Sequence, residues 1–332
     1  MNKSDIILET DGENANNQYA TYELKTSILG MKVSLPTISP QKNELFRARK
    51  RNMSIDSPFA TYIEHVSSLE DFLENYDVRQ SDYEEFSREY QDKIVNYSFD
   101  LHPNENTTEE IVNALHEIQI NAESPFLFEY ENDINQNENS LNTQLDKTKA
   151  WLKEQDSNKI LVPVIDMKIR EEGLFLRKLN SILTKYNRIN VIYRSPNITT
   201  ANWSDLKKFL KNNKIWCHMD CVLNRYNNDK IAHRVRLYAM GVSSTSIGFP
   251  FGGSGSNKKR ISQFNTSSHT YELLAPPHLP SFAEKRDRTW INSLNAEIAT
   301  LQEMREHVTL KTLYTNYIPS ISSNYLVFTE GV

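Results

Sequence analysis

Short runs of β-branched and aromatic residues recur along this chain, separated by longer charged stretches. Eight of these runs predict strands, at residues 32–38, 58–66, 94–101, 125–131, 159–166, 189–195, 214–220 and 235–242. Between most of them, apolar residues recur every three or four positions, as in 169–186, and this spacing predicts amphipathic helices. Strands and helices alternating in this way are typical of a parallel sheet with crossover helices.

Eight strand-helix units favour a closed (β/α)8 TIM-like barrel, with an open doubly wound sheet as the alternative. We expect a polar, disordered tail at 1–20, the barrel at 21–275 and a C-terminal helical extension at 276–332. Within the barrel, the polar stretch 132–147 is interpreted as a surface insertion without a core of its own.

Composition limits the classes of function. The 332 residues carry a net charge of −5, so nucleic-acid binding would need a local basic patch rather than a basic surface overall. The two cysteines, Cys217 and Cys221, are too few for a disulfide framework and are interpreted as core residues, and we expect no metal and no cofactor. The sequence has no apolar signal segment and no run long enough to span a bilayer, which predicts a cytoplasmic protein without membrane contact.

Charged side chains stand where several predicted strands end. In a barrel, the carboxyl ends of the strands form the active-site face, so these residues are candidates for catalysis. Side chains two positions apart point to the same face of a strand, which groups His218 with Asp220 and Asp166 with Lys168. The catalytic candidates are Asp220, Asp100, His218, Asp166 and Lys168, and Arg194 is a candidate for substrate binding. A solvated strand end or a structural histidine is the alternative interpretation.

Five of the nine glycines fall within residues 241–255, and a basic run follows them. Glycine allows backbone N–H groups to converge on an anion, so this loop is a candidate phosphate site at the same face. The phosphate-binding candidates are Gly248, Gly252, Gly253, Gly255, Lys258, Lys259 and Arg260. No nucleotide-binding fingerprint is present, and a mobile lid is the alternative.

Three short segments carry a resemblance to a known enzyme family. Asp220-Cys-Val-Leu-Asn-Arg225 is similar to the Asp-Cys-Val-Leu-Pro-Thr-Arg segment that carries the nucleophilic aspartate of the tRNA-guanine transglycosylase superfamily. Tyr22-Glu-Leu-Lys with Leu35-Pro-Thr-Ile-Ser-Pro40, and the stretch that begins Phe264-Asn-Thr-Ser-Ser, resemble other family segments. The family's Cys-x-Cys zinc cluster is absent, and Met240-Gly-Val242 follows the aspartate rather than preceding it.

The resemblance implies a barrel enzyme that exchanges a nucleobase in RNA or DNA. Asp220 would be the nucleophile, Asp100 an acid or base, and the glycine-rich loop with its basic run would hold the polynucleotide backbone. Two alternatives remain open: a non-catalytic barrel subunit of a nucleic-acid or defence assembly, and an enzyme acting on a sugar phosphate or another small metabolite. The C-terminal helices are a candidate surface for a protein partner or a second copy of the chain.

Overall fold

The computed structural model describes most of the chain between residues 6 and 304. The described residues are 6–11, 23–28, 30–35, 37–66, 68–101, 107–167, 169, 171, 173–194, 205–206, 209–210, 215–222, 242–246, 261–266, 270–274 and 282–304. They form a mixed α/β fold whose largest sheet has six parallel strands, with seven helices in the described part of the chain.

The six-stranded sheet has the order β4-β11-β10-β9-β8-β7. These strands are β4 (Thr37–Ile38), β11 (Ser244–Ser246), β10 (Trp216–Val222), β9 (Arg188–Arg194), β8 (Ile160–Asp166) and β7 (Phe126–Glu129). Every neighbouring pair is parallel. Two further strands, β5 (Phe59–Val66) and β6 (Ile94–Leu101), form a separate parallel pair.

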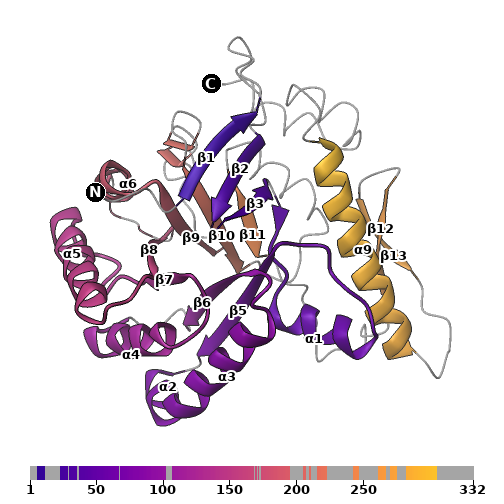
Figure 1. The fold of residues 1–332 in the computed structure, drawn as a ribbon, viewed down its shortest axis with the longest axis horizontal. Helices are drawn as coiled ribbons and strands as arrows, with labels where there is room; N and C mark the ends of the chain where they lie inside the picture. The colour runs from indigo at the N-terminus through magenta and orange to yellow at the C-terminus, as the bar shows by residue number, and fades with distance from the viewer. Residues whose placement is uncertain are drawn as a thin grey trace.

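The β5–β6 pair lies beside both ends of the six-stranded sheet. After β4, Gln41 forms a parallel bridge with Thr61 of β5, and the Thr61 N–H donates to the carbonyl of Pro40 over 2.8 Å. On the other side, Ser124 Oγ, just before β7, donates to the Val95 carbonyl of β6 over 2.7 Å. In Figure 1, β5 to β11 follow one another in chain order around the middle of the molecule.

Side chains of strands that are distant in this order meet in a common interior. The rings of Phe59 in β5 and Phe126 in β7 stack on Trp216 of β10, with centroids 6.4 and 5.0 Å apart. Neighbouring strands lie about 4.8 Å apart, so a flat sheet would keep β5 and β10 far beyond side-chain contact. The strands therefore curve around these residues.

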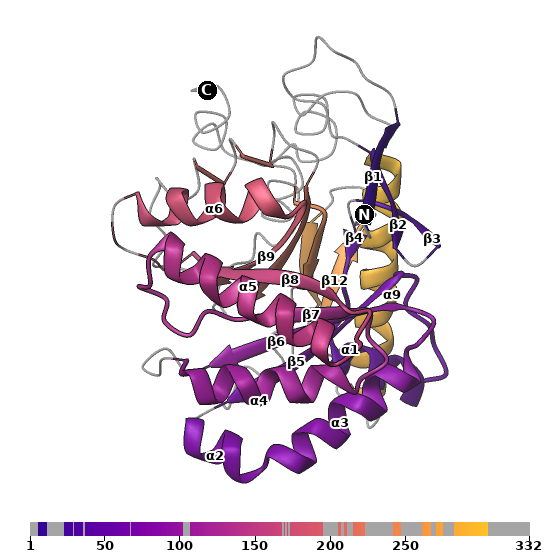
Figure 2. The ribbon, with the colours of Figure 1, turned by 60° about the vertical axis from the view of Figure 1, so that its left-hand side comes forward.

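Helices cover the outer side of the strands. They are α1 (Lys42–Lys50), α2 (Leu69–Glu74), α3 (Tyr76–Glu89), α4 (Glu109–Ile120), α5 (Glu138–Glu154), α6 (Leu174–Lys185) and α9 (Phe282–Met304). Figure 2 shows α3, α4, α5 and α6 side by side along the strands. Apolar faces explain this packing: Leu179 and Ile182 of α6 share a buried cluster with Ile165 of β8 and Val191 of β9.

The last described helix, α9, packs against the first. Asp287 of α9 forms ion pairs with Arg47 and with Arg51, which caps the end of α1, and Trp290 Nε1 donates to Glu44 of α1 over 3.2 Å. The hairpin of β12 (Ile261–Asn265) and β13 (Thr270–Leu274) joins this region, because the Phe264 N–H donates to Ser293 Oγ over 2.9 Å. The C-terminal helix α9 thus packs on α1 and on the β12–β13 hairpin.

The structure differs from the sequence prediction at three places. Ile6–Asp11, inside the predicted tail, form β1, which pairs antiparallel with β2 (Glu23–Ile28), and β2 pairs with β3 (Met31–Ser34). Residues 138–147 of the predicted insertion belong to α5, whose Leu141 and Leu145 are buried. The last strand of the parallel sheet in the described residues lies at Ser244–Ser246, after the predicted run 235–242, of which the structure describes only Val242.

Candidate functional site

Polar side chains from neighbouring strands occupy the interior above the aromatic layer. His218 and Asp220 alternate along β10 with Cys217 and Met219, so they share the interior face with Trp216. The register places Ser244 of β11 and Asn190 of β9 beside His218. All of these polar residues are buried, and Asp220 is only 3% exposed. Buried polar groups need partners, and these residues supply them to one another.

Three side chains donate hydrogen bonds to the carboxylate of Asp220. Ser246 Oγ donates to Oδ1 over 2.5 Å, and His218 Nε2 lies 3.2 Å from the same oxygen. Asn190 Nδ2 donates to Oδ2 over 2.9 Å. A carboxylate oxygen accepts two hydrogen bonds, so Oδ1 is saturated while Oδ2 keeps one acceptor position among the described residues.

This environment keeps Asp220 ionised. Burial would raise its pKa, because an interior solvates a charge poorly. Hydrogen bonds from His218, Ser246 and Asn190, with the electrostatic attraction of His218, outweigh burial and lower the pKa of Asp220 below its ordinary value of 3.8. Asp220 is therefore an oriented, negatively charged carboxylate in the interior.

The contacts of His218 define which of its ring nitrogens carries the proton. Nδ1 lies 2.7 Å from Ser244 Oγ and 3.5 Å from Asn96 Nδ2 of β6. An amide nitrogen only donates, so Nδ1 is the acceptor and Nε2 donates to Asp220. His218 thus orients the carboxylate through Nε2.

The contacts among Ser244, His218 and Asp220 are also those of a hydrolase triad, in which the histidine takes a proton from the serine. Here Ser244 is fully buried within β11, between His218 of β10 and Thr37 of β4 in the sheet register. A nucleophilic serine needs an open side for the acyl carbon and donors for the oxyanion. Among the described residues, the Ser244 hydroxyl contacts Nδ1 of His218, so we interpret Ser244 as a positioning residue for His218.

Two buried acceptors beside this network have no partner in the described structure. They are Oδ1 of Asn96 and Oδ1 of Asn190, whose amide nitrogens contact His218 and Asp220. A buried polar atom without a hydrogen bond costs about 1–3 kcal/mol. Such atoms are expected where a substrate supplies the missing N–H or O–H donor.

Two of the other predicted catalytic residues also stand at strand ends on the interior side. Asp166 ends β8 and lies in register with Ile192, which itself pairs with Asp220. The Cα atoms of Asp166 and Asp220 are therefore two strands apart, about 10 Å. Asp100 lies near the end of β6, four positions after Asn96 and on the same face. Both carboxylates are partly exposed, unlike Asp220.

The remaining predicted residues divide into three groups. The backbone of Arg194 pairs with Val222 at the end of β9, but its side chain is outside the described structure, as is all of Lys168. The candidate phosphate site also lies outside the described residues, namely Gly248, Gly252, Gly253, Gly255, Lys258, Lys259 and Arg260. Cys217 is a buried core residue as predicted, and burial raises the pKa of its thiol.

Four members of the network were not predicted from the sequence: Ser244, Ser246, Asn190 and Asn96. Ser244 and Ser246 fall in the stretch interpreted as a glycine-rich loop, and the two asparagines lie inside strands with an apolar pattern. For the two serines, the sequence offers one signal: they are two positions apart, which matches the two-residue period of a strand. The two asparagines have no such signal.

No protein-family model matches this chain, and no curated protein matches it. Among the described residues, no group of three or more histidine, cysteine or acidic side chains is arranged to hold a metal ion. None of the helices in the described ranges is long and apolar enough to cross a membrane.

Proposed function

We propose that the chain folds as a closed (β/α)8 barrel. The order β4 to β11 uses eight strands in chain sequence, and β4, the first of them, pairs with β11, the last. Asn96 of β6 contacts β10, the strand opposite β6 in an eight-stranded barrel, and Phe59 of β5 contacts β10 from three strands away. The packing of α9 on α1 is the contact expected where the outer ring of helices closes.

We further propose that this barrel is a glycosyl-transfer enzyme that exchanges a nucleobase in RNA or DNA. The observation that carries the proposal is the carboxylate of Asp220, which is buried, ionised, held by three donors and left with one acceptor position on Oδ2. A reaction at a sugar carbon passes through an oxocarbenium-like state, which such a carboxylate stabilises or traps covalently. The resemblance around Asp220 points to the same chemistry.

In the proposed reaction, Oδ2 of Asp220 bonds to C1′ of the target nucleotide while the C1′–N bond to the base breaks. The bonding electron pair leaves with the base, which takes a proton from a second carboxyl group. The incoming base then bonds to C1′ through a nitrogen, returns a proton to that carboxylate and displaces Asp220. Asp100 and Asp166 are the two candidates for the second carboxyl group, since both stand at strand ends on the interior side.

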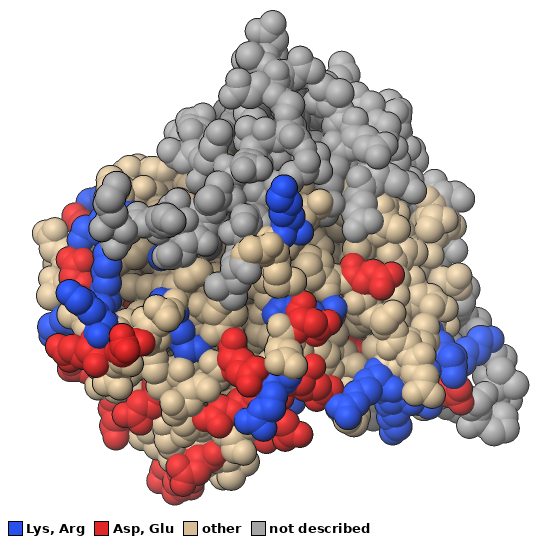
Figure 3. Space-filling model, in the orientation of Figure 1, with Lys and Arg blue, Asp and Glu red and all other residues tan. Residues whose placement is uncertain are grey.

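The surface charge limits where a polynucleotide could lie. Figure 3 shows acidic side chains gathered at the lower left, where Figure 1 places α2, α3 and α4, and the first turn of α2 contains Glu70 and Asp71. Phosphate groups would be repelled there. The proposal therefore assigns backbone binding to the strand-end face, with Lys258, Lys259 and Arg260 as its basic residues.

The test is base exchange with labelled guanine, using bulk tRNA and single- and double-stranded DNA as acceptors. We expect incorporation of label by the wild-type protein, its loss in Asp220→Asn with retained nucleic-acid binding, and a covalent adduct that survives denaturation. Asp146→Asn is the matched control, because Asp146 is an exposed carboxylate on α5 paired with Lys185. Comparing Asp100→Asn with Asp166→Asn identifies the proton donor.

The alternatives give different results. A non-catalytic subunit of a larger assembly would bind nucleic acid, incorporate no label and tolerate Asp220→Asn. An enzyme for a small metabolite would show no affinity for RNA or DNA even at low salt, where phosphate contacts are strongest. Either result would overturn the proposal.

A further inference from the structure

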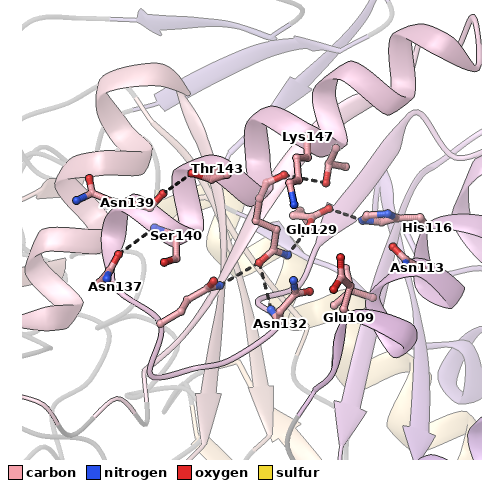
Figure 4. A pocket seen from close by; sticks show the side chains of 14 residues that line it. Glu109, Asn113, His116, Glu129, Asn132, Asn137, Asn139, Ser140, Thr143 and Lys147 are labelled. Carbon is pink, nitrogen blue, oxygen red and sulfur yellow. Dashed lines mark hydrogen bonds and ion pairs between the residues drawn. The ribbon is translucent and has the colours of Figure 1, made fainter.

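A polar cavity lies on the outer side of β7, between α4 and α5, and has a volume of about 470 Å³ (Figure 4). Phe126 of β7 faces the interior, where it stacks on Trp216, whereas Glu129 lies at the alternate face toward the helices and lines this cavity. The cavity is therefore separate from the Asp220 site. Its size is within the range of small-molecule sites, about 300–1,000 Å³.

The deepest charged group of this cavity is fully paired. Glu129 is completely buried and forms a hydrogen bond with His116 of α4, and Gln144 Nε2 of α5 donates to its other oxygen over 2.5 Å. The ring of His116 stacks on Trp151, with centroids 5.2 Å apart. These contacts hold the three polar side chains in place before any ligand arrives. Pre-formed polar groups of this kind are typical of binding sites.

The walls are dominated by uncharged hydrogen-bonding groups. Nine of the fourteen lining residues are Asn, Gln, Ser or Thr, and Val112 is the only aliphatic one. Figure 4 shows Asn113, Asn132 and Thr143 around the cavity, from α4, the segment after β7, and α5. Asn132 Oδ1 is buried and has no partner among the described residues. Asn132 therefore lines the cavity and has hydrogen-bonding capacity that no described residue uses.

The lining excludes several classes of ligand. Glu109 disfavours an anion, Lys147 disfavours a cation, and Glu129 already has His116 and Gln144 as hydrogen-bond partners. An apolar molecule would bury the amides and hydroxyls without hydrogen bonds, which is unfavourable. A hydroxyl group both donates and accepts, so a molecule dense in hydroxyls satisfies a lining of mixed amides and hydroxyls.

We propose that the cavity between α4 and α5 binds a small, neutral, hydroxyl-rich molecule of the polyol or saccharide class, and that Asn132 and Thr143 contact it directly. Buried polar clusters often add no stability over apolar packing of the same volume, so the floor of Glu129, His116 and Gln144 supports a binding role more than a structural one. This site is independent of the base exchange proposed for Asp220.

The experiment is titration calorimetry and saturation-transfer NMR on the full chain, with glucose, sucrose and myo-inositol as probes. Glucose 6-phosphate and glucosamine are size-matched charged probes. We expect at least one neutral probe to bind with a dissociation constant below about 10 mM, and the charged probes at least tenfold more weakly. Asn132→Ala should weaken binding about five- to tenfold, the usual effect of losing one hydrogen bond.

Two further variants keep the result interpretable. Thr143→Val preserves shape on an exposed helical position, so it tests the same prediction if Asn132→Ala is poorly folded by circular dichroism. Lys149→Ala, an exposed α5 residue outside the cavity lining, should leave binding unchanged. Binding of no neutral probe, equal binding of the charged probes, or binding that both Asn132→Ala and Thr143→Val leave intact would each overturn the proposal.

Discussion

The ion pair of Glu131 with Lys178 is the most sharply testable element of this structure. Lys178 of α6 is completely buried, and its ammonium group contacts the Glu131 carboxylate and donates to the carbonyl of Ile134 over 2.7 Å. The pair ties the segment between β7 and α5, which includes Asn132, to the neighbouring helix. We predict that Lys178→Met destabilises the protein in a manner that depends on pH.

The size of the effect follows from the pKa of Glu131. Burial raises that pKa from 4.5 to about 7, although the charge and hydrogen bond of Lys178 oppose the rise. Because the folded value is raised, the stability linked to this group is greatest below pH 4.5 and is lost as pH rises, until the loss stops near pH 7. Without Lys178 the pKa rises further, so the variant continues to lose about 1.4 kcal/mol per pH unit above pH 7.

At pH 6, Glu131 is largely protonated in both proteins, and the substitution should cost only lost packing and hydrogen bonding, about 1 kcal/mol. At pH 9 the additional cost should approach about 3 kcal/mol, within the range for breaking a buried pair. Urea unfolding at pH 6, 7, 8 and 9 measures the difference. The double variant Glu131→Gln with Lys178→Met lacks the titrating group and should show no such growth relative to wild type. A cost for Lys178→Met that is equal at pH 6 and pH 9 would refute the reasoning.

Two further predictions concern carboxylates whose pKa is lowered. Asp287→Asn removes the acceptor shared by Arg47 and Arg51 and should cost about 2–4 kcal/mol in urea unfolding, whereas the exposed Asp146→Asn should change stability by less than about 0.5 kcal/mol. Equal costs for the two variants would contradict the role given to α9. The pKa of Asp220 is lowered despite burial, so its contribution is present above pH 3.8 and is lost as pH falls below that value. The destabilisation caused by Asp220→Asn should therefore be smaller at pH 3 than at pH 7 in thermal unfolding, and an equal loss at both pH values would show that Asp220 is not ionised in the folded protein.

The parallel strands were largely predictable, because burial on both faces requires apolar, β-branched sequences that stand out from their surroundings. Six of the predicted runs correspond to β5, β6, β7, β8, β9 and β10, and the first run, 32–38, contains most of β3 and all of β4. The exception is β11, whose sequence is Ser-Thr-Ser. Its two buried serines form hydrogen bonds with His218 and Asp220 instead of apolar contacts. A strand stabilised in this way has no hydrophobic period for sequence analysis to detect.

The helix α5 was missed for a related reason. Its buried face includes Leu141, Leu145 and Leu152, a narrow apolar stripe, while asparagine and other polar residues fill the positions before and between them. Residues 132–147 were therefore interpreted as an insertion because most of them are polar, although the leucines have helical spacing. Several of these polar residues line the cavity between α4 and α5. The polar composition that made the helix hard to predict therefore also supplies the proposed binding site.

Of the candidate site, the sequence predicted only the residues that can carry a charge, Asp220 and His218. Asp220 and His218 are two positions apart, and this spacing correctly placed them on one face of a strand. Their partners Asn96, Asn190 and Ser246 come from three other strands, and only the sheet order and register bring them together. A sequence pattern reports the period within one strand and carries no information on which strands become neighbours.

The division of the interior into two layers connects this site to function. Phe59, Phe126 and Trp216 form an aromatic layer, and the layer beyond it contains His218 and Asp220 with their asparagine and serine partners. Stability alone would favour branched apolar residues at both levels of this interior. The polar layer instead leaves two amide oxygens without donors among the described residues, at a cost of about 1–3 kcal/mol each. A substrate that donates hydrogen bonds to Asn96 and Asn190 would recover this energy while it places its sugar carbon at Oδ2 of Asp220, so binding and positioning for reaction would arise from the same contacts.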